Sequence, residues 1–329
     1  MSVDVRDRLP GVVLLGALAV SARGLSALVG INELLLAIGL GALVANTTGV
    51  PERLRPGTAT HSVWLGAGIV LLGASVTIDA IVDAGSAVLL LLLGTVTVTL
   101  VTAETIARNV AGVGEKLGSL LAAGASICGV SAVAAVGGAV RAKETQIAYA
   151  AGVVLLVDAV TIVVYPIVGR VLGLPAAVFG VWAGVSMLST GPVIAVGFAH
   201  SEVAGQWATT TKLARNALIG AVALGYAVYY TRRHGEKSVP LSVLWVDFPK
   251  FVLGFLVFVG LASAGLFSPT QQASIAEVVG WLFLLAFVGL GTEIRIADLR
   301  RTGVRPALVV FATILLVSVL SLSVALAVL

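Results

Sequence analysis

The sequence is poor in cysteine, histidine and charge. It has one cysteine, Cys128, three histidines, and only 11% charged residues among 329. A single cysteine excludes an internal disulfide and a metal cage built from several thiolates. Three histidines scattered along the chain (His61, His200 and His234) argue against a metal site. We therefore expect neither a metal ion nor a cofactor.

The sequence also lacks a long polar stretch. The longest polar connection, TRRHGEKSVP at 231–240, leaves no room for a soluble domain. Instead, 59% of the residues are hydrophobic and the mean hydropathy is +1.09. We expect an all-α polytopic membrane protein with about 9–11 transmembrane segments and a single transmembrane domain over residues 1–329. The eleven apolar segments lie at 10–30, 32–49, 63–81, 85–107, 118–140, 146–173, 176–199, 205–230, 249–267, 274–294 and 306–329.

The formal net charge of +4 is not a sign of nucleic-acid binding in such a chain. Basic residues of a membrane protein concentrate in its cytoplasmic loops. Most of them fall on one side if the N-terminus is cytoplasmic, which predicts a multi-pass protein of the cytoplasmic membrane with its C-terminus outside. We expect the lipid bilayer as a partner, and association into a homodimer is left open. Examples on the cytoplasmic side are Arg6, Arg53, Arg108, Lys116, Arg232 and Arg305.

Two internal matches indicate inverted repeats, which are typical of transporters. GASVTIDAIVDAG (73–85) resembles GTEIRIADLRRTG (291–303), and the corresponding repeats cover about 73–107 and 291–329. A second match, at an offset of 60 residues, aligns Ser126 with Ser186 and Gln146 with Gln206. The repeats around it cover about 118–173 and 176–230.

Small polar residues interrupt two of the apolar segments, as in GASICGVSAV at 124–133. We interpret 118–140 and 176–199 as re-entrant hairpins, with limbs of about ten residues that reach about 15 Å into the membrane. Irregular backbone at that depth needs cover from protein or water, and small residues permit such close packing. Counting basic residues on each side also favours hairpins. Broken helices that cross the membrane are the alternative.

The motifs AAGASICGVSAV, TKLARNALIG (211–220) and FPKFVLGFLVF (248–258) resemble the YeiH family of proposed sulfate exporters. That family is distantly similar to the bile-acid symporter and cation antiporter group. The resemblance implies a two-domain, inverted-repeat transporter. One departure is that the family's His-Glu-x-x-Gln motif in the second interrupted segment is replaced here by LSTGP (188–192), so proton coupling through this segment is in doubt.

Ionisable residues inside apolar segments are candidates for function, because a buried charge is costly in a membrane. Lys212 and Arg215 are three residues apart, hence on one face of a helix, and could bind an anion near the midplane together with the positive helix ends at the tips. Alternatively they snorkel or pair with Asp158 as structural contacts. Asp158 is a salt-bridge partner or a single proton carrier for coupling.

The two tips supply further candidates for substrate binding. Their hydroxyl groups could donate to an oxyanion, although each is as able to bond its own helix backbone. Cys128 is also interpreted as a small buried filler. The tip candidates are Ser126, Cys128, Gly129, Ser131, Ser186, Ser189, Thr190 and Gly191.

These features predict a secondary transporter that moves a small inorganic or organic anion, such as sulfate or another sulfur oxyanion, by alternating access. The alternatives are a passive anion channel and a cation-coupled transporter of a small carboxylate. An intramembrane hydrolase is disfavoured because neither serine-bearing tip contains a histidine as general base. We therefore expect no catalytic residue.

Overall fold

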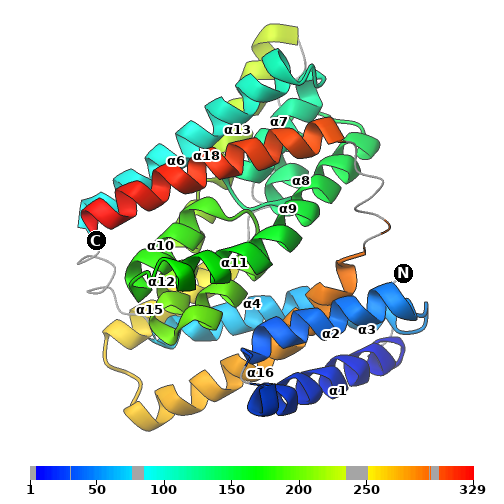
Figure 1. Cartoon of the computed structure of the whole chain (residues 1–329), viewed down its shortest axis with the longest axis vertical. Helices are drawn as coiled ribbons and strands as arrows, with labels where there is room; N and C mark the ends of the chain where they lie inside the picture. Colours follow the sequence, from blue (N-terminus) through cyan, green and yellow to red (C-terminus); the bar gives the residue numbers. More distant parts are fainter. Residues whose placement is uncertain (1–4, 30, 76–84, 235–250, 296, 298–303) are drawn as a thin grey trace. The chain divides into compact units, whose positions relative to one another are not determined.

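The computed structural model describes residues 5–29, 31–75, 85–234, 251–295, 297 and 304–329, and these ranges are mostly helical and contain no strand (Figure 1). The chain divides into two compact units, each built from two separate stretches. The first comprises residues 1–84 and 250–296, and the second comprises 85–249 and 297–329. The predicted all-α polytopic architecture is confirmed, whereas the single domain over 1–329 stays a prediction.

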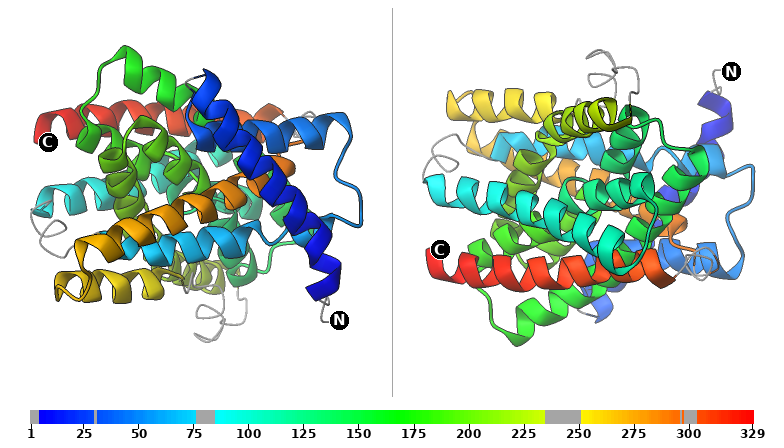
Figure 2. Two further views of the ribbon diagram at one scale, coloured as in Figure 1. Left: turned by 90° about the horizontal axis from the view of Figure 1, so that it is seen from below. Right: turned by 90° about the horizontal axis from the view of Figure 1, so that it is seen from above.

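The first unit is centred on one long helix, α16. This helix packs against α2 and α4, while α1 lies obliquely across it (Figure 2). Gly41 of α2 and Gly291 of α16 face each other so closely that a Cβ on either would collide with the other helix's backbone, which is the small-residue contact expected between membrane helices. The elements are α1 (Val5–Val29), α2 (Glu33–Thr47), α3 (Arg55–Thr58), α4 (His61–Leu72), η1 (Gly73–Ser75), α15 (Phe251–Ser263) and α16 (Pro269–Glu293).

The second unit contains both interrupted segments and two long helices, α6 and α18, that lie side by side. Its buried core is made of small and aliphatic side chains, including Leu120, Val153, Val181 and Val310. The elements are α6 (Gly85–Thr105), the π-helical turn η2 (Ile106–Val110), α7 (Glu115–Ser126), α8 (Val130–Ala139), α9 (Glu144–Val171), α10 (Ala176–Ser186), α11 (Thr190–His200), α12 (Glu202–Asn216), α13 (Ile219–His234) and α18 (Val304–Val328).

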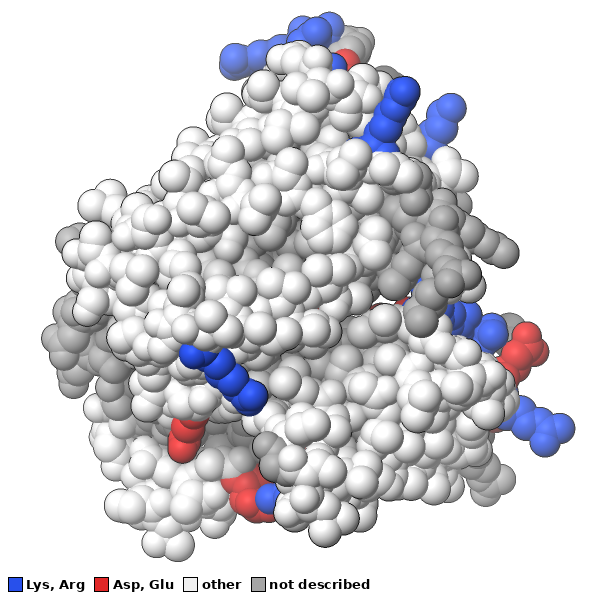
Figure 3. All heavy atoms as spheres, viewed as in Figure 1, with Lys and Arg blue, Asp and Glu red and all other residues white. Residues whose placement is uncertain are grey.

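Five helices among the described residues are long and apolar enough to cross a membrane, and they lie in α1, α6 with η2, α9, α16 and α18. Large apolar side chains stay exposed on these helices, among them Leu90, Val171 and Leu315. Charged atoms occupy few places on the face drawn in Figure 3. Such a surface fits hydrocarbon rather than water.

The structure corrects one predicted segment and leaves another partly outside the described residues. The segment at 205–230 is not one helix but two, α12 and α13, separated by Ala217 and Leu218. Most of the two matched motifs of the first repeat pair, 73–85 and 291–303, including Ile78 and Ile296, lies outside the described residues. The second pair lies within the described residues and stays a prediction. Its first copy contains α7, α8 and α9, and its second copy contains α10, α11, α12 and α13.

Candidate functional site

The first interrupted segment, α7 and α8, is a helical hairpin. Lys116 at the start of α7 donates to the carbonyl oxygen of Arg141 just after α8, at 3.3 Å. Gly124 lies against Val133, so the two limbs run antiparallel. The tip is Ile127, Cys128 and Gly129, with Gly129 at a φ of 65°, a conformation that favours glycine. The predicted limbs therefore fold back on each other.

The second interrupted segment, α10 and α11, is also a hairpin. His200 at the end of α11 stacks on Phe179 near the start of α10, with ring centroids 4.1 Å apart. The same histidine lies 3.2 Å from the carbonyl oxygen of Leu174. Both ends of the segment therefore lie together, and its tip is Met187, Leu188 and Ser189. Ser126 and Ser186, which the sequence match pairs, are the last residues of the first limbs.

The helix after the second hairpin, α12, packs against both of its limbs. Gly180 and Gly184 of α10 leave no space for a Cβ because α12 backbone lies against them, and Gly197 of α11 is equally close to α12. Ten residues of helix from Glu202 reach about 15 Å, so Lys212 arrives at about the depth of the hairpin tips. The glycines thus place Lys212 and Arg215 between the two tips.

Lys212 and Arg215 are completely buried, and both donate to carbonyl oxygens at the tips. The Lys212 ammonium donates to Ile127 at 2.8 Å, to Met187 at 3.0 Å and to Leu188. Arg215 binds the same region through Nε to Ser126 at 2.5 Å, Nη1 to Met187 at 2.7 Å and Nη2 to Ala125 at 2.5 Å. These carbonyls belong to the ends of α7 and α10, where helices carry unpaired acceptors and partial negative charge.

In this structure the donors of Lys212 and Arg215 bind backbone oxygens of the hairpin tips. An ammonium has three N–H donors, and all three of Lys212 are used on backbone oxygens. The ion pairs among the described residues do not include one between Asp158 and Lys212 or Arg215. The cations therefore neutralise helix ends in this structure, and their direct contact with a substrate stays a prediction.

Asp158 of α9 lies at a helix N-terminus, the start of α11, whereas Lys212 and Arg215 lie at helix C-termini. It is 3% exposed, and its Oδ1 accepts from the backbone N–H of Ser189, at 3.2 Å, where α11 begins. Its Oδ2 is buried without a hydrogen-bond donor. Negative charge at a helix N-terminus is favourable, so the tips hold cations at their carbonyl ends and a carboxyl group at the N–H end of α11.

Asn216, which sequence reasoning missed, also contacts the start of α11. Its Nδ2 donates to Thr190 Oγ1 at 2.9 Å, while its Oδ1 is a second buried acceptor without a donor. Its position four residues after Lys212 was the available signal, because that spacing puts both on one helix face. Two acceptors that lack donors beside one helix start point to a proton, water or cation that supplies the missing contact.

The hydroxyl groups of the tips divide into two sets. Ser126 and Ser186 are fully buried and donate within their own helices, to Ala123 at 3.2 Å and Trp182 at 2.5 Å. The other three hydroxyl-bearing residues are less buried: Ser131 is exposed, while Ser189 and Thr190 are half-buried. Cys128 and Gly191 are buried. Of these candidates, Ser189 contacts the Asp158 carboxyl group through its backbone N–H, and Thr190 accepts from Asn216.

The two tips touch each other. A Cβ on Gly129 would collide with the Ser189 hydroxyl and would crowd Val154 of α9. Tyr165 of α9, a second residue not found from the sequence, donates to Ser186 at 2.9 Å and ties the second hairpin to the longest helix. The interrupted segments are thus one assembly, held by α9 on one side and α12 on the other.

Comparison with known proteins gives a family match over most of the chain. The model of the family described as "Conserved hypothetical protein 698" matches residues 10–310. A UPF0324 membrane protein of Nitratidesulfovibrio vulgaris is 31% identical over 315 residues, which cover 91% of this chain and 87% of that relative. A UPF0324 membrane protein of Vibrio vulnificus is 31% identical over 87% of this chain and 90% of its own length.

Some relatives are longer than this chain. Another UPF0324 membrane protein of Nitratidesulfovibrio vulgaris is 33% identical over 81% of this chain, which spans 49% of that relative. No solved structure matches. The printed names of these relatives describe a membrane protein and state no substrate.

Proposed function

The chain belongs to the family described as "Conserved hypothetical protein 698", with UPF0324 membrane proteins as relatives, and we propose that it is a secondary transporter. It moves a small anion by alternating access. The observation that supports this most is the meeting of two hairpin tips around buried charges. Broken helices that meet near the membrane midplane are a typical binding site of secondary transporters. Ionisable residues within membrane-spanning segments are rare and mark substrate or ion pathways.

We place the anion at the N–H ends of the hairpin tips, near Ser189 and Thr190. Backbone N–H groups at a helix start bind oxyanions well, and both hydroxyls are half-buried rather than enclosed. Lys212 and Arg215 contribute from the carbonyl side. By neutralising the carbonyl ends they keep the local potential positive, which favours a divalent anion such as sulfate or another sulfur oxyanion, the substrate that the YeiH resemblance implies.

Asp158 is the candidate for coupling. An ionised carboxylate beside the anion would repel it, whereas a protonated one would not and could donate from Oδ2 to the anion. Anion binding and protonation of Asp158 would then favour each other, which is the thermodynamic basis of coupled transport. If sodium replaces the proton, Asp158 Oδ2 and Asn216 Oδ1 are the oxygens that would bind it.

The decisive experiment is uptake of radiolabelled sulfate by proteoliposomes that contain the intact protein. Saturable uptake that an acidic exterior stimulates is expected, with the stimulation lost in Asp158→Asn while sulfate still shifts the melting temperature of that variant. Flux that never saturates would favour a channel instead. Sodium-dependent uptake of a carboxylate that sulfate does not inhibit would favour the carboxylate transporter. No flux of any small anion would refute the proposal.

A further inference from the structure

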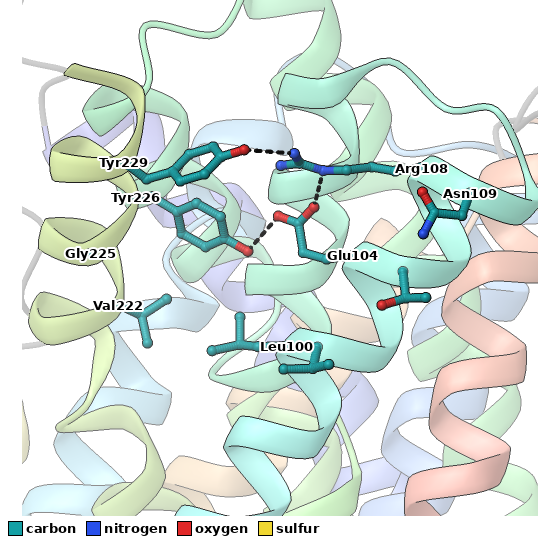
Figure 4. A pocket seen from close by; sticks show the side chains of 10 residues that line it. Leu100, Glu104, Arg108, Asn109, Val222, Gly225, Tyr226 and Tyr229 are labelled. Carbon is teal, nitrogen blue, oxygen red and sulfur yellow. Dashed lines mark hydrogen bonds and ion pairs between the residues drawn. The ribbon is translucent and has the colours of Figure 1, made fainter. Parts of the chain in front are cut away.

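A cavity lies within the second unit, away from the hairpin tips in sequence. It is an open groove of about 520 Å³ between the C-terminal part of α6 with η2 and the helix α13. Volumes of this size are typical of small-ligand sites. Figure 4 shows Tyr226 and Tyr229 of α13 reaching toward Glu104 and Arg108.

The groove changes from apolar to polar along its length. Leu100 and Val101 of α6 and Val222 of α13 line one end, and Arg108, Asn109 and Tyr229 line the other. Both helices run from the apolar end to the polar end, since Glu104 bonds Tyr226 at 2.8 Å and Arg108 bonds Tyr229 at 3.1 Å further along. The occupant should therefore be amphipathic, with its apolar part beside Leu100 and Val222.

The depth of the groove matches one leaflet of a bilayer. The membrane-spanning stretch here is Val88–Val110, and the groove occupies its last part, from Leu100 to Asn109. About ten residues of helix correspond to about 15 Å, which is half of a hydrocarbon core. Val101 is 61% exposed and Gly225 is also exposed, so the groove is open along its side. A chain-like amphiphile that lies in one leaflet fits this shape.

The polar end carries an excess of positive charge. Arg108 is held by ion pairs to Glu104 at 2.5 Å and Glu115 at 3.0 Å, and Arg233 lies 3.6 Å from the same Glu115. The Arg233 side chain is 59% exposed. The Lys116 ammonium lies 5.8 Å from the centroid of the Tyr230 ring, so three basic residues at this end outnumber the two acidic ones. Basic residues at a membrane edge attract anionic lipid head groups.

The backbone at the polar end is itself unusual. Ile106–Val110 form a π-helical turn, and the N–H of Ala111 donates to the carbonyl oxygen of Ile106 at 2.8 Å. Such turns are rare and occur often at functional sites. The π-helical turn contains Arg108 and Asn109, and both residues line the polar end of the groove.

We propose that this groove binds one anionic phospholipid, with an acyl chain along Leu100, Val101 and Val222 and the phosphate at Arg233 and Asn109. The polarity gradient, the depth of one leaflet and the basic edge all favour this occupant over a water-soluble molecule. The bound lipid would join α6 to α13, the helix that follows Asn216 of the candidate transport site. This inference is independent of the proposed substrate.

The first test is native mass spectrometry of the intact protein in mild detergent with added phosphatidylglycerol. Val101→Trp fills the groove, and Val319→Trp on α18 is the matched control because the two valines are similarly exposed, at 61% and 57%. The lipid-bound peak should be lost in Val101→Trp and kept in Val319→Trp. Equal lipid binding by the two variants would overturn the proposal.

The second test addresses the head group. The wild-type protein should prefer phosphatidylglycerol to phosphatidylcholine with the same acyl chains, and Arg233→Gln should weaken phosphatidylglycerol binding about fivefold while phosphatidylcholine binding stays unchanged. Equal binding of both lipids by the wild type would refute an anionic head-group site. Displacement of phosphatidylglycerol by excess inorganic phosphate alone would show that the ligand is a free phosphate rather than a lipid.

Discussion

Lys212 and Arg215 satisfy backbone groups that a membrane cannot solvate. Together they donate to the carbonyl oxygens of Ala125, Ser126, Ile127, Met187 and Leu188. Each buried acceptor left without a donor costs about 1–3 kcal/mol. Their burial is therefore linked to the existence of the tips, and a variant can affect stability as well as transport.

Lys212→Met should destabilise the protein by about 2–4 kcal/mol, because the carbonyl oxygens of Ile127 and Leu188 lose their donor and that of Met187 keeps only Arg215. The measurement is the midpoint of unfolding in detergent. Lys143→Met, at an exposed lysine, is the matched control and should leave the midpoint unchanged. Equal stability of the two variants would contradict a stabilising role for Lys212.

Gly129→Val should reduce both stability and anion transport more than Gly138→Val in the same hairpin. Gly129 has a positive φ and lies against Ser189, whereas a Cβ on Gly138 would meet only open space. Backbone strain alone costs about 1–3 kcal/mol at such a position. Uptake by proteoliposomes at matched protein content compares the two, and greater damage at Gly138 would refute a role for the contact between the tips.

At the scale of elements, the hairpins could be predicted from sequence because glycine and serine gather where the backbone leaves the helix. The hairpin expected at 118–140, with limbs of about ten residues, differs little from the observed limbs Glu115–Ser126 and Val130–Ala139. The break between α12 and α13 could not be predicted from sequence, because the stretch Asn216, Ala217 and Leu218 has neither glycine nor proline. The contacts of Lys212 and Arg215 with the tip carbonyl oxygens could not be predicted either. The sequence indicates that a charge is buried but not which atoms surround it.

Gly184→Leu should separate α10 from α12, because its side chain would collide with Thr211 and the carbonyl oxygen of Ala208. Overpacking of this kind costs about 1–3 kcal/mol. Gly220→Leu in α13 is the control, since a Cβ there meets open space. Thermal unfolding should show a lower midpoint only for Gly184→Leu, and identical midpoints would mean that α12 tolerates displacement from the hairpin.

At the scale of the whole chain, α9 connects the two hairpins. It follows the first hairpin and precedes the second, and its apolar stretch Thr145–Val171 is long enough to cross a membrane. We predict that each hairpin begins and ends at one membrane face, so that the two enter from opposite faces. This is the inverted symmetry that the match at an offset of 60 residues predicts.

Single cysteines test this arrangement in a Cys128→Ser background. A cysteine replacing Arg141, after the first hairpin, should react with an impermeant maleimide only from the cytoplasmic side. One replacing Arg170, at the end of α9, should react only from outside. Both arginines are exposed, so access should not limit the reaction. Labelling of both positions from the same side would contradict opposite entry of the hairpins.

The position of α12 against both limbs of the second hairpin also sets an order of assembly during synthesis. Residues 176–200 leave the ribosome before α12, yet their tip carbonyls obtain donors only from Lys212 and Arg215. The hairpin therefore cannot complete its contacts until about thirty residues after its first limb have been made. A chain that stalls before Lys212 would expose an unfinished tip, which makes it a substrate for membrane quality control.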